Sequence, residues 1–253
     1  MRPPMEKVVA AFAEQTGVPV RMTSADSGTL LTQIRETRRG DVYVCHDPFG
    51  TVAEREGFTT DVLTVAVLRP VIVVPKGNPK GIKGLDDLGR PGLRLALPDP
   101  QYATAGVVLQ AMLEKAGLRE EVDANAVTRA RESSMLANAV ALGTGNIDAA
   151  VCWDAIARQH PNDLTVIPIA PDYNVDAVTS ASGKVYQVDS IRVTACVLKF
   201  TSHSKEVKTL LDLCISEEGR RIFSEAGFTL VEPAPEVAKS GTESGVARPV
   251  EEP

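Results

Sequence analysis

The chain has 253 residues and a formal net charge of −6, with 43% hydrophobic and 4% aromatic residues. This length and apolar content suit one large globular domain or two lobes of ordinary size. The negative charge argues against a nucleic-acid partner bound through bulk electrostatics, and the few aromatic residues argue against stacking platforms for bases. A small anion remains compatible, because local dipoles can hold one inside an acidic protein.

The chain opens on an amphipathic helical pattern. In MRPPMEKVVAAFAEQTG, Pro3 and Pro4 stand near the start and Gly17 closes the pattern. The segment has no n-region, h-region or cleavage site of a secretory signal. No apolar run approaches the ~20 residues that span a bilayer. Taken as written, the sequence alone predicts a cytoplasmic protein.

Strand-like and helix-like segments then alternate, which is typical of an α/β protein with mostly parallel strands. The predicted strands cover residues 18–23, 42–45, 71–75, 94–98, 149–153, 165–169 and 192–198. The predicted helices cover residues 4–15, 28–38, 49–56, 105–116, 133–143, 154–159, 205–214 and 217–225.

Two long β-rich runs predict crossings between two lobes. They are VLTVAVLRPVIVVPKGNP and the later KVYQVDSIRVTACVLKF, and a lobe of normal domain size fits between them. We expect one lobe from residues 1–68 plus 191–232 and a second from residues 69–190. The Pro-, Glu- and Ser-rich tail, 233–253, has little to bury and is expected to be disordered.

Three predicted helix starts carry small donor residues: Ser27-Gly28-Thr29, Thr104-Ala105-Gly106 and Ser133-Ser134. Each is compatible with an ordinary helix cap. Each is also compatible with an anion site, because a helix N-terminus presents unpaired N–H groups and a positive dipole end. Helix starts that follow parallel strands face a common crevice, so three of them could donate to one compact anion.

No pattern of an enzyme or metal site competes with this interpretation. The chain has no G-x-S-x-G elbow, P-loop or dinucleotide fingerprint. Its cysteines fit no zinc or redox spacing, and buried inert thiols are expected. His46, at a strand end, is interpreted as a loop histidine. We therefore expect a protein that is not an enzyme and has no cofactor.

Several segments in a fixed order resemble the molybdate- and tungstate-binding solute receptors of ABC importers. They are SGTLLTQI, GDVYVCHDPFGTVAEREGF, RPVIVVPKGNPKGIKGLDDLGRPGLRLALPDPQYATAG, GNIDAAVCWDAIA and EEGRRIFSEAGFTL. The resemblance covers about residues 3 to 230. It implies a two-lobed periplasmic binding protein fold of type II with two crossing strands, each lobe a mostly parallel sheet flanked by helices. It also implies a monomer that binds molybdate or tungstate, partners the importer's membrane subunits and is periplasmic or faces the cell exterior.

The resemblance also assigns site residues. It places Ser27, beside Gly28, as the hydroxyl donor of the first lobe. It places Ala105 as a backbone donor of the second lobe, with Thr104 and Gly106 beside it. Another backbone donor falls within the Ser133-Ser134 helix start. A family tyrosine falls near Arg192, which would bring a full charge and a forked donor to an oxyanion, or would face solvent.

The start of the chain departs from the family pattern. Family members have a signal peptide, a first strand and a Ser-bearing loop before the helix that corresponds to residues 4–15. In this sequence Met1 stands where that loop should end, so the first strand is expected to be missing. Either the start was assigned too late, which is the simplest explanation, or the sequence was trimmed, or the protein has lost half of one lobe's binding loop.

Two alternatives stay open at this point. The ligand could be another tetrahedral anion, sulfate or phosphate; a protonated phosphate would need an acceptor such as Asp26 or Asp99. The protein could instead be a cytoplasmic ligand-sensing domain built on the same fold. Molybdate and tungstate themselves are too alike in size and charge to be separated from sequence.

Overall fold

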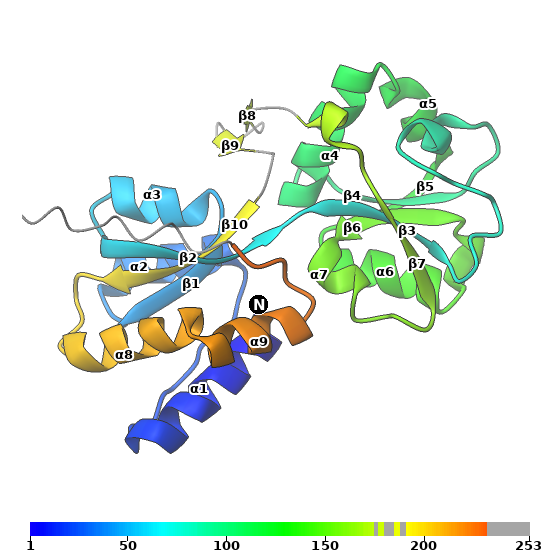
Figure 1. The fold of residues 1–253 in the computed structure, drawn as a ribbon. Coiled ribbons are helices and arrows are strands. Elements are labelled where there is room, and N and C mark those ends of the chain that lie inside the picture. Colours follow the sequence, from blue (N-terminus) through cyan, green and yellow to red (C-terminus); the bar gives the residue numbers. More distant parts are fainter. Residues whose placement is uncertain (175–176, 180–184, 188–190, 232–253) are drawn as a thin grey trace, which may run out of the picture.

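The computed structural model describes residues 1–174, 177–179, 185–187 and 191–231; the predicted tail, 233–253, lies outside them. Figure 1 shows two lobes on either side of a pair of crossing strands, and the main sheet of each lobe is flanked by helices. The two-lobed α/β fold is therefore confirmed. The exact lobe boundaries stay a prediction, with the first crossing passing from a strand that ends at Leu68 to one that begins at Pro70.

The first lobe contains both ends of the described chain around a three-stranded sheet of order β1-β10-β2. Its elements are α1 (Arg2–Thr16), α2 (Ser27–Thr37), β1 (Val42–His46), α3 (Phe49–Arg55), β2 (Thr59–Leu68), β10 (Ile191–Leu198), α8 (Ser204–Ile215) and α9 (Glu217–Glu225). The predicted helices 4–15, 28–38, 49–56, 205–214 and 217–225 all form to within two residues at each end.

The second lobe is built on a five-stranded sheet of order β5-β4-β6-β3-β7. Its elements are β3 (Pro70–Pro75), η1 (Asp86–Gly89), β4 (Leu95–Pro98), α4 (Thr104–Ala116), α5 (Arg119–Asn125), β5 (Ala126–Ala130), α6 (Ser133–Ala141), η2 (Thr144–Asn146), β6 (Ala149–Trp153), α7 (Asp154–Ala157), β7 (Leu164–Pro168) and η3 (Pro171–Tyr173). Strands β8 (Ala177–Thr179) and β9 (Val185–Gln187) pair antiparallel in a separate two-stranded sheet.

Neither main sheet is mostly parallel: the pairings of the first-lobe sheet are antiparallel, and the second-lobe sheet is mixed. In the first lobe β10 runs antiparallel to β1 and to β2. In the second lobe β4 is parallel to β5 and β6, whereas β3 is antiparallel to β6 and β7. The physical reason lies in the crossings, because a chain that leaves a lobe on one strand and returns on its neighbour must reverse direction.

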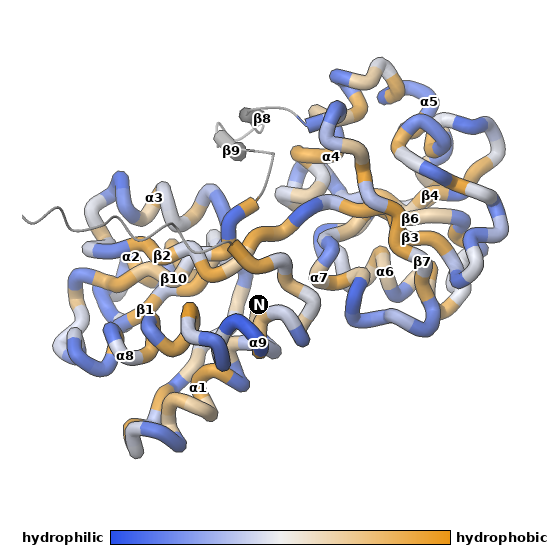
Figure 2. The backbone as a smooth tube through the Cα atoms, in the orientation of Figure 1, coloured by the Kyte–Doolittle hydropathy of each residue, from blue (hydrophilic) through white to orange (hydrophobic). Residues whose placement is uncertain are grey.

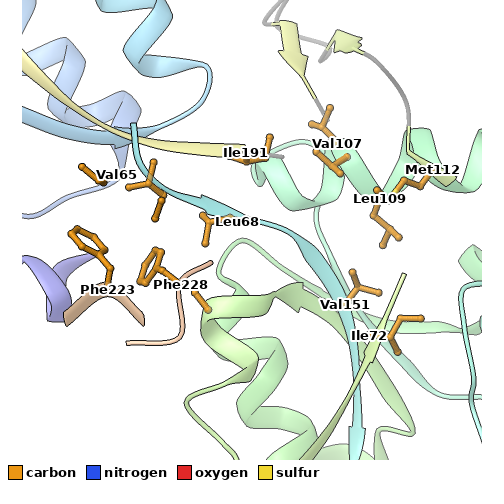
Figure 3. Packing of buried hydrophobic residues seen from close by; sticks show 14 of the residues in the cluster. Val65, Leu68, Ile72, Val107, Leu109, Met112, Val151, Ile191, Phe223 and Phe228 are labelled. Atoms are coloured by element: carbon orange, nitrogen blue, oxygen red, sulfur yellow. The ribbon is translucent and has the colours of Figure 1, made fainter. Parts of the chain in front are cut away.

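Apolar side chains of the strands and of one helix face form the core. Figure 2 shows hydrophobic residues concentrated along β2, β3 and β6. In α4, Val108, Leu109, Met112 and Leu113 recur at helical spacing and are buried. Figure 3 shows how buried residues follow the crossing, from Val65 and Leu68 through to the core of the second lobe.

The sequence did not predict α5 and β5. Residues 127–129 of β5 are exposed, and β5 lies at the edge of its sheet. Such a strand needs no apolar alternation, so the pattern that identifies half-buried strands is missing there.

The predicted strand 18–23 is wrong, because residues 17–26 form neither helix nor strand. Among the described residues no strand pairs with the outer edge of β1. A cavity of about 1080 Å³ lies there, and its lining includes Met5, Phe12, Val20 and Val44. The cavity extends along the unpaired edge of β1, between side chains of α1, α2 and α8 such as Met5, Ile34 and Leu210.

Candidate functional site

Two helices of the second lobe begin after neighbouring strands, at one edge of its sheet. The parallel strands β4 and β5 end side by side, with Pro98 opposite Ala130, and the N–H of Asp99 donates to the Ala130 carbonyl at 3.0 Å. After short loops the chain enters α4 at Thr104 and α6 at Ser133. The structure thus places the predicted residues Thr104, Ala105 and Gly106, and Ser133 and Ser134, after neighbouring strand ends at the same edge of the sheet.

No side chain caps either of these helices. The residues before them are Ala103 and Glu132, and neither accepts a capping hydrogen bond. The first N–H groups of a helix have no acceptor within the helix. The starts of α4 and α6 therefore offer main-chain donors and two positive dipole ends at one sheet edge.

Gly106 has a packing role that is independent of any ligand. A Cβ atom at this position would lie 2.5 Å from both the Asp99 carbonyl carbon and the Pro100 nitrogen. Glycine therefore permits α4 to lie directly against the loop that follows β4. This close approach places the buried Ala105 and its N–H at the sheet edge.

The start of α2 in the first lobe differs, because Asp26 caps it. The Asp26 carboxylate accepts from the Thr29 N–H at 3.0 Å and from the Thr29 hydroxyl at 2.6 Å. These hydrogen bonds, first the one from the hydroxyl, lower the pKa of Asp26, which is therefore a carboxylate at neutral pH. The predicted donor Ser27 is 5% exposed, and its carbonyl accepts from the Tyr43 hydroxyl at 2.6 Å. Gly28 lies against the ring of Phe49.

Arg192 is held by a buried aspartate. Its Nε and one terminal nitrogen donate to the two carboxylate oxygens of Asp47, at 2.9 and 3.1 Å, and its main-chain N–H donates to Asp47 at 3.0 Å. The same guanidinium reaches Thr51 Oγ1 at 3.2 Å. Arg192 thus ties β10 to the end of β1. Its predicted contact with a ligand stays a prediction, and the structure adds that its charge is matched by Asp47.

His46 lies at the same end of β1, next to Asp47. Its Nδ1 is 2.8 Å from the Asp47 carbonyl oxygen, and its ring meets Phe49 edge to face, with centroids 5.6 Å apart. Burial lowers the pKa of His46, so the ring is neutral at pH 7. The edge of the first lobe therefore gathers His46, Asp47, Phe49 and the α2 start.

Sequence reasoning missed an arginine beside the second-lobe helix starts. The Arg131 guanidinium stacks 3.6 Å from the centroid of the Tyr102 ring, and Tyr102 is 59% exposed. Arg131 follows β5 and Tyr102 follows β4, so the stack spans the same two loops as the helix starts. Because β5 was not predicted from sequence, no signal marked Arg131 as a residue of this edge.

The expectation of buried thiols is confirmed, because all four cysteines are buried and free. Burial raises the pKa of Cys152 and of Cys214 to about 12. In the part of the chain that the structure describes, no three His, Cys, Asp or Glu side chains gather as metal ligands. No helix within the described ranges is long and apolar enough to cross a membrane.

The fold is that of the two-lobed periplasmic binding proteins of type II. The chain is similar to the periplasmic molybdate-binding protein of Azotobacter vinelandii, with 20% identity, a TM-score of 0.66, and coverage of 90% of this chain and 95% of the other. It is also similar to iron-bound HitA from Pseudomonas aeruginosa, with 18% identity, a TM-score of 0.68, and coverage of 93% and 87%.

The sequence comparison shows the family. The chain belongs to the bacterial extracellular solute-binding proteins, whose family profile matches residues 1–229. It is 27% identical over 218 residues to the molybdate-binding protein ModA of Mycobacterium tuberculosis, covering 85% of this chain and 76% of that relative. The chain is thus a solute-binding receptor of the ABC transporter class.

Proposed function

We propose that this receptor binds a tetrahedral oxyanion, molybdate or tungstate, between its lobes and delivers it to the membrane subunits of an ABC importer outside the cytoplasm. The observation that carries the proposal is the pair of uncapped helix starts, α4 and α6, at one edge of the second-lobe sheet. A fully deprotonated dianion accepts hydrogen bonds only, and main-chain N–H groups at helix starts are donors only. The similarity to molybdate-binding proteins supports the choice of anion.

Proline substitutions test this proposal, because proline removes an N–H where a helix tolerates it best, at the first position. Thr104→Pro and Ser133→Pro each delete one donor, and the preceding residues already have the extended backbone that proline requires of its neighbour. Glu217→Pro at the start of α9, which Ser216 caps, is the matched control.

The readout is calorimetric titration of each protein with molybdate, tungstate, sulfate and phosphate. A hydrogen bond to a charged group contributes about 1.5–3 kcal/mol, so each site variant should bind molybdate at least about tenfold more weakly. Glu217→Pro should bind as the wild type does. Equal affinities in all four proteins would contradict the proposal.

Asp26 favours a second candidate, hydrogen phosphate, because a carboxylate at the α2 start can accept the proton that such a ligand carries. The two ligands predict opposite signs for Asp26→Ala. Removing the negative charge should strengthen the binding of a dianion such as molybdate. It should weaken the binding of hydrogen phosphate, which would lose an acceptor.

A further inference from the structure

The segment that follows α9 connects the two lobes through Thr229. Its main-chain carbonyl accepts from the N–H of Val67, in β2 of the first lobe, at 2.8 Å. Its hydroxyl donates to the Asp154 carboxylate, at the start of α7 in the second lobe, at 2.8 Å. One residue therefore holds both lobes, through its main chain on one side and its side chain on the other.

Asp154 is the buried anchor of this contact, with 3% exposure. Its other carboxylate oxygen accepts from the N–H of Arg69 at 3.1 Å and from that of Ala155 at 2.9 Å. Arg69 is the residue between β2 and β3, at the first crossing. The carboxylate is thus fixed by the second lobe and by the crossing strand, and Thr229 supplies its hydrogen bond from the other lobe.

Arg158 and Gly227 extend the contact. Arg158 donates to the Gly227 carbonyl at 3.0 Å and to the Thr229 hydroxyl at 3.3 Å, and it lies 3.6 Å from Asp154. Gly227 has φ +88°, and a Cβ there would lie 2.8 Å from the Ala155 carbonyl oxygen. Glycine is required here because the main chain presses directly against α7.

This contact and the helices α3 and α4 lie on opposite sides of the crossing strands. Figure 1 shows α3 and α4 above the crossing, and α7, α9 and the segment after α9 below it. Figure 3 shows Val107 of α4 beside Ile191 on the upper side, and Phe228 on the lower side. A hinge motion at the crossing strands that brings α3 and α4 closer together would therefore move Thr229 away from Asp154.

We propose that Thr229, Asp154 and Arg158 form a latch that holds the lobes apart in the unliganded receptor and is released when they close on the ligand. These are positioning residues, because their hydrogen bonds link the two lobes to each other. The inference rests on the proposed function only in that a ligand drives the closure. If releasing one hydrogen bond to a carboxylate opposes closure, its removal should raise the closed fraction and tighten binding by about tenfold.

The test measures the distance between the lobes without ligand. Spin labels on cysteines introduced at the exposed Glu54 of α3 and Glu114 of α4 report the separation on the upper side, since the native cysteines are all buried. Thr229→Val removes the hydroxyl and keeps the shape of the side chain. Thr209→Val, on the exposed face of α8, is the matched control.

In Thr229→Val the distance distribution should shift toward shorter values, whereas Thr209→Val should match the wild type. Arg158→Gln removes the guanidinium that bonds Gly227 and Thr229, at a half-exposed position. This variant should shift the distance distribution in the same direction, and it tests the latch if Thr229→Val does not fold. Wild-type distances in both variants, or longer ones, would overturn the latch.

Titration with sodium molybdate then separates the two proposals. Tighter binding by the latch variants is expected. If the wild type binds no molybdate, the proposed function fails, and the unliganded distances still test the latch on their own.

Discussion

Both lobes contain apolar segments that predict strands, but only in the second lobe do all of the predicted strands form. In the second lobe all five strands of the main sheet are paired, and helices α4 and α6 cover its faces. In the first lobe the predicted strand 18–23 stays unpaired beside a cavity of about 1080 Å³. The difference teaches that apolar alternation alone does not make a strand, because residues 18–23 stay unpaired although the outer edge of β1 borders the same cavity.

The helices of the proposed site also differ between the lobes in whether a side chain caps them. The first-lobe helix α2 is capped by its own Asp26, whereas the second-lobe helices α4 and α6 are left uncapped. The contrast concerns the helices of the proposed site and not the whole lobes, because α1, α3 and α8 of the first lobe also lack a side-chain cap.

The largest effect is expected from filling the cavity of the first lobe. A designed strand of about seven residues, with valine or isoleucine facing the core, is joined ahead of Arg2 through a short loop. Burying two or three such side chains contributes about 5 kcal/mol, which corresponds to a rise in melting temperature of ~10–20 °C for a chain of this size.

The control for the cavity experiment is the same extension with aspartate at the inward positions, which should give no rise in melting temperature. Equal melting temperatures for the apolar and the aspartate extension would show that the cavity does not accept a strand.

A matched pair of truncations compares the two cores directly. Val151 of β6 is fully buried in the second lobe, whereas Val44 of β1 lines the cavity. Val151→Ala should lower the free energy of unfolding by about 2 kcal/mol, and Val44→Ala by less than about 1 kcal/mol. Urea titration of both variants measures this, and equal losses would mean that the first lobe is as tightly packed as the second.

Two arginines at the crossings make a second comparison. Arg192 donates hydrogen bonds to the Asp47 carboxylate from its guanidinium and from its main-chain N–H. Arg69 bonds Asp154 through its main chain: its N–H donates to the carboxylate, and its carbonyl accepts from the Asp154 N–H. Arg192→Ala should lower the free energy of unfolding by about 2 kcal/mol, because a buried carboxylate loses a charged donor. Arg69→Ala should change it by less than ~0.5 kcal/mol. Chemical denaturation would show the prediction wrong if the two losses were alike.

The smallest effect comes from exchanging the caps without changing charge. Asp26→Glu moves the carboxylate away from Thr29 and should cost α2 about 0.5–1 kcal/mol, whereas Glu132→Asp should stabilise α6 by a similar amount. Glu132→Asp should also weaken oxyanion binding, because the new cap occupies donors of the site. Thermal unfolding and calorimetry measure the two effects, and a stabilised Glu132→Asp protein with unchanged affinity would remove α6 from the site.

The cap of α2 also has a defined pH dependence. The folded-state pKa of Asp26 is lowered by Thr29, below the ordinary value of about 3.9. Its contribution to stability is therefore complete above that ordinary value and is lost as the pH falls through the lower, folded-state pKa. The difference in stability between the wild type and Asp26→Glu should accordingly be present at pH 7 and shrink toward pH 2.

Much of the fold could be predicted from local pattern. The eight predicted helices all form, because apolar residues at helical spacing and glycine stops such as Gly117 act within a few residues. The same holds for the central strands β3, β4 and β6, whose continuous apolar runs are buried on both faces. The order of lobes and crossings followed from the length between the two β-rich runs.

The sequence by itself thus determined the helices, the buried strands and the presence of small donor residues at three helix starts, because these depend on neighbours along the chain. Only the tertiary structure decided which starts stay open, that Arg192 is bound to Asp47, and that residues 18–23 do not form a strand. It also placed Arg131 on Tyr102 and Thr229 on Asp154. The physical reason is that strand pairing, charge neutralisation and close approach require partners that are distant in sequence and become neighbours only when the lobes are assembled.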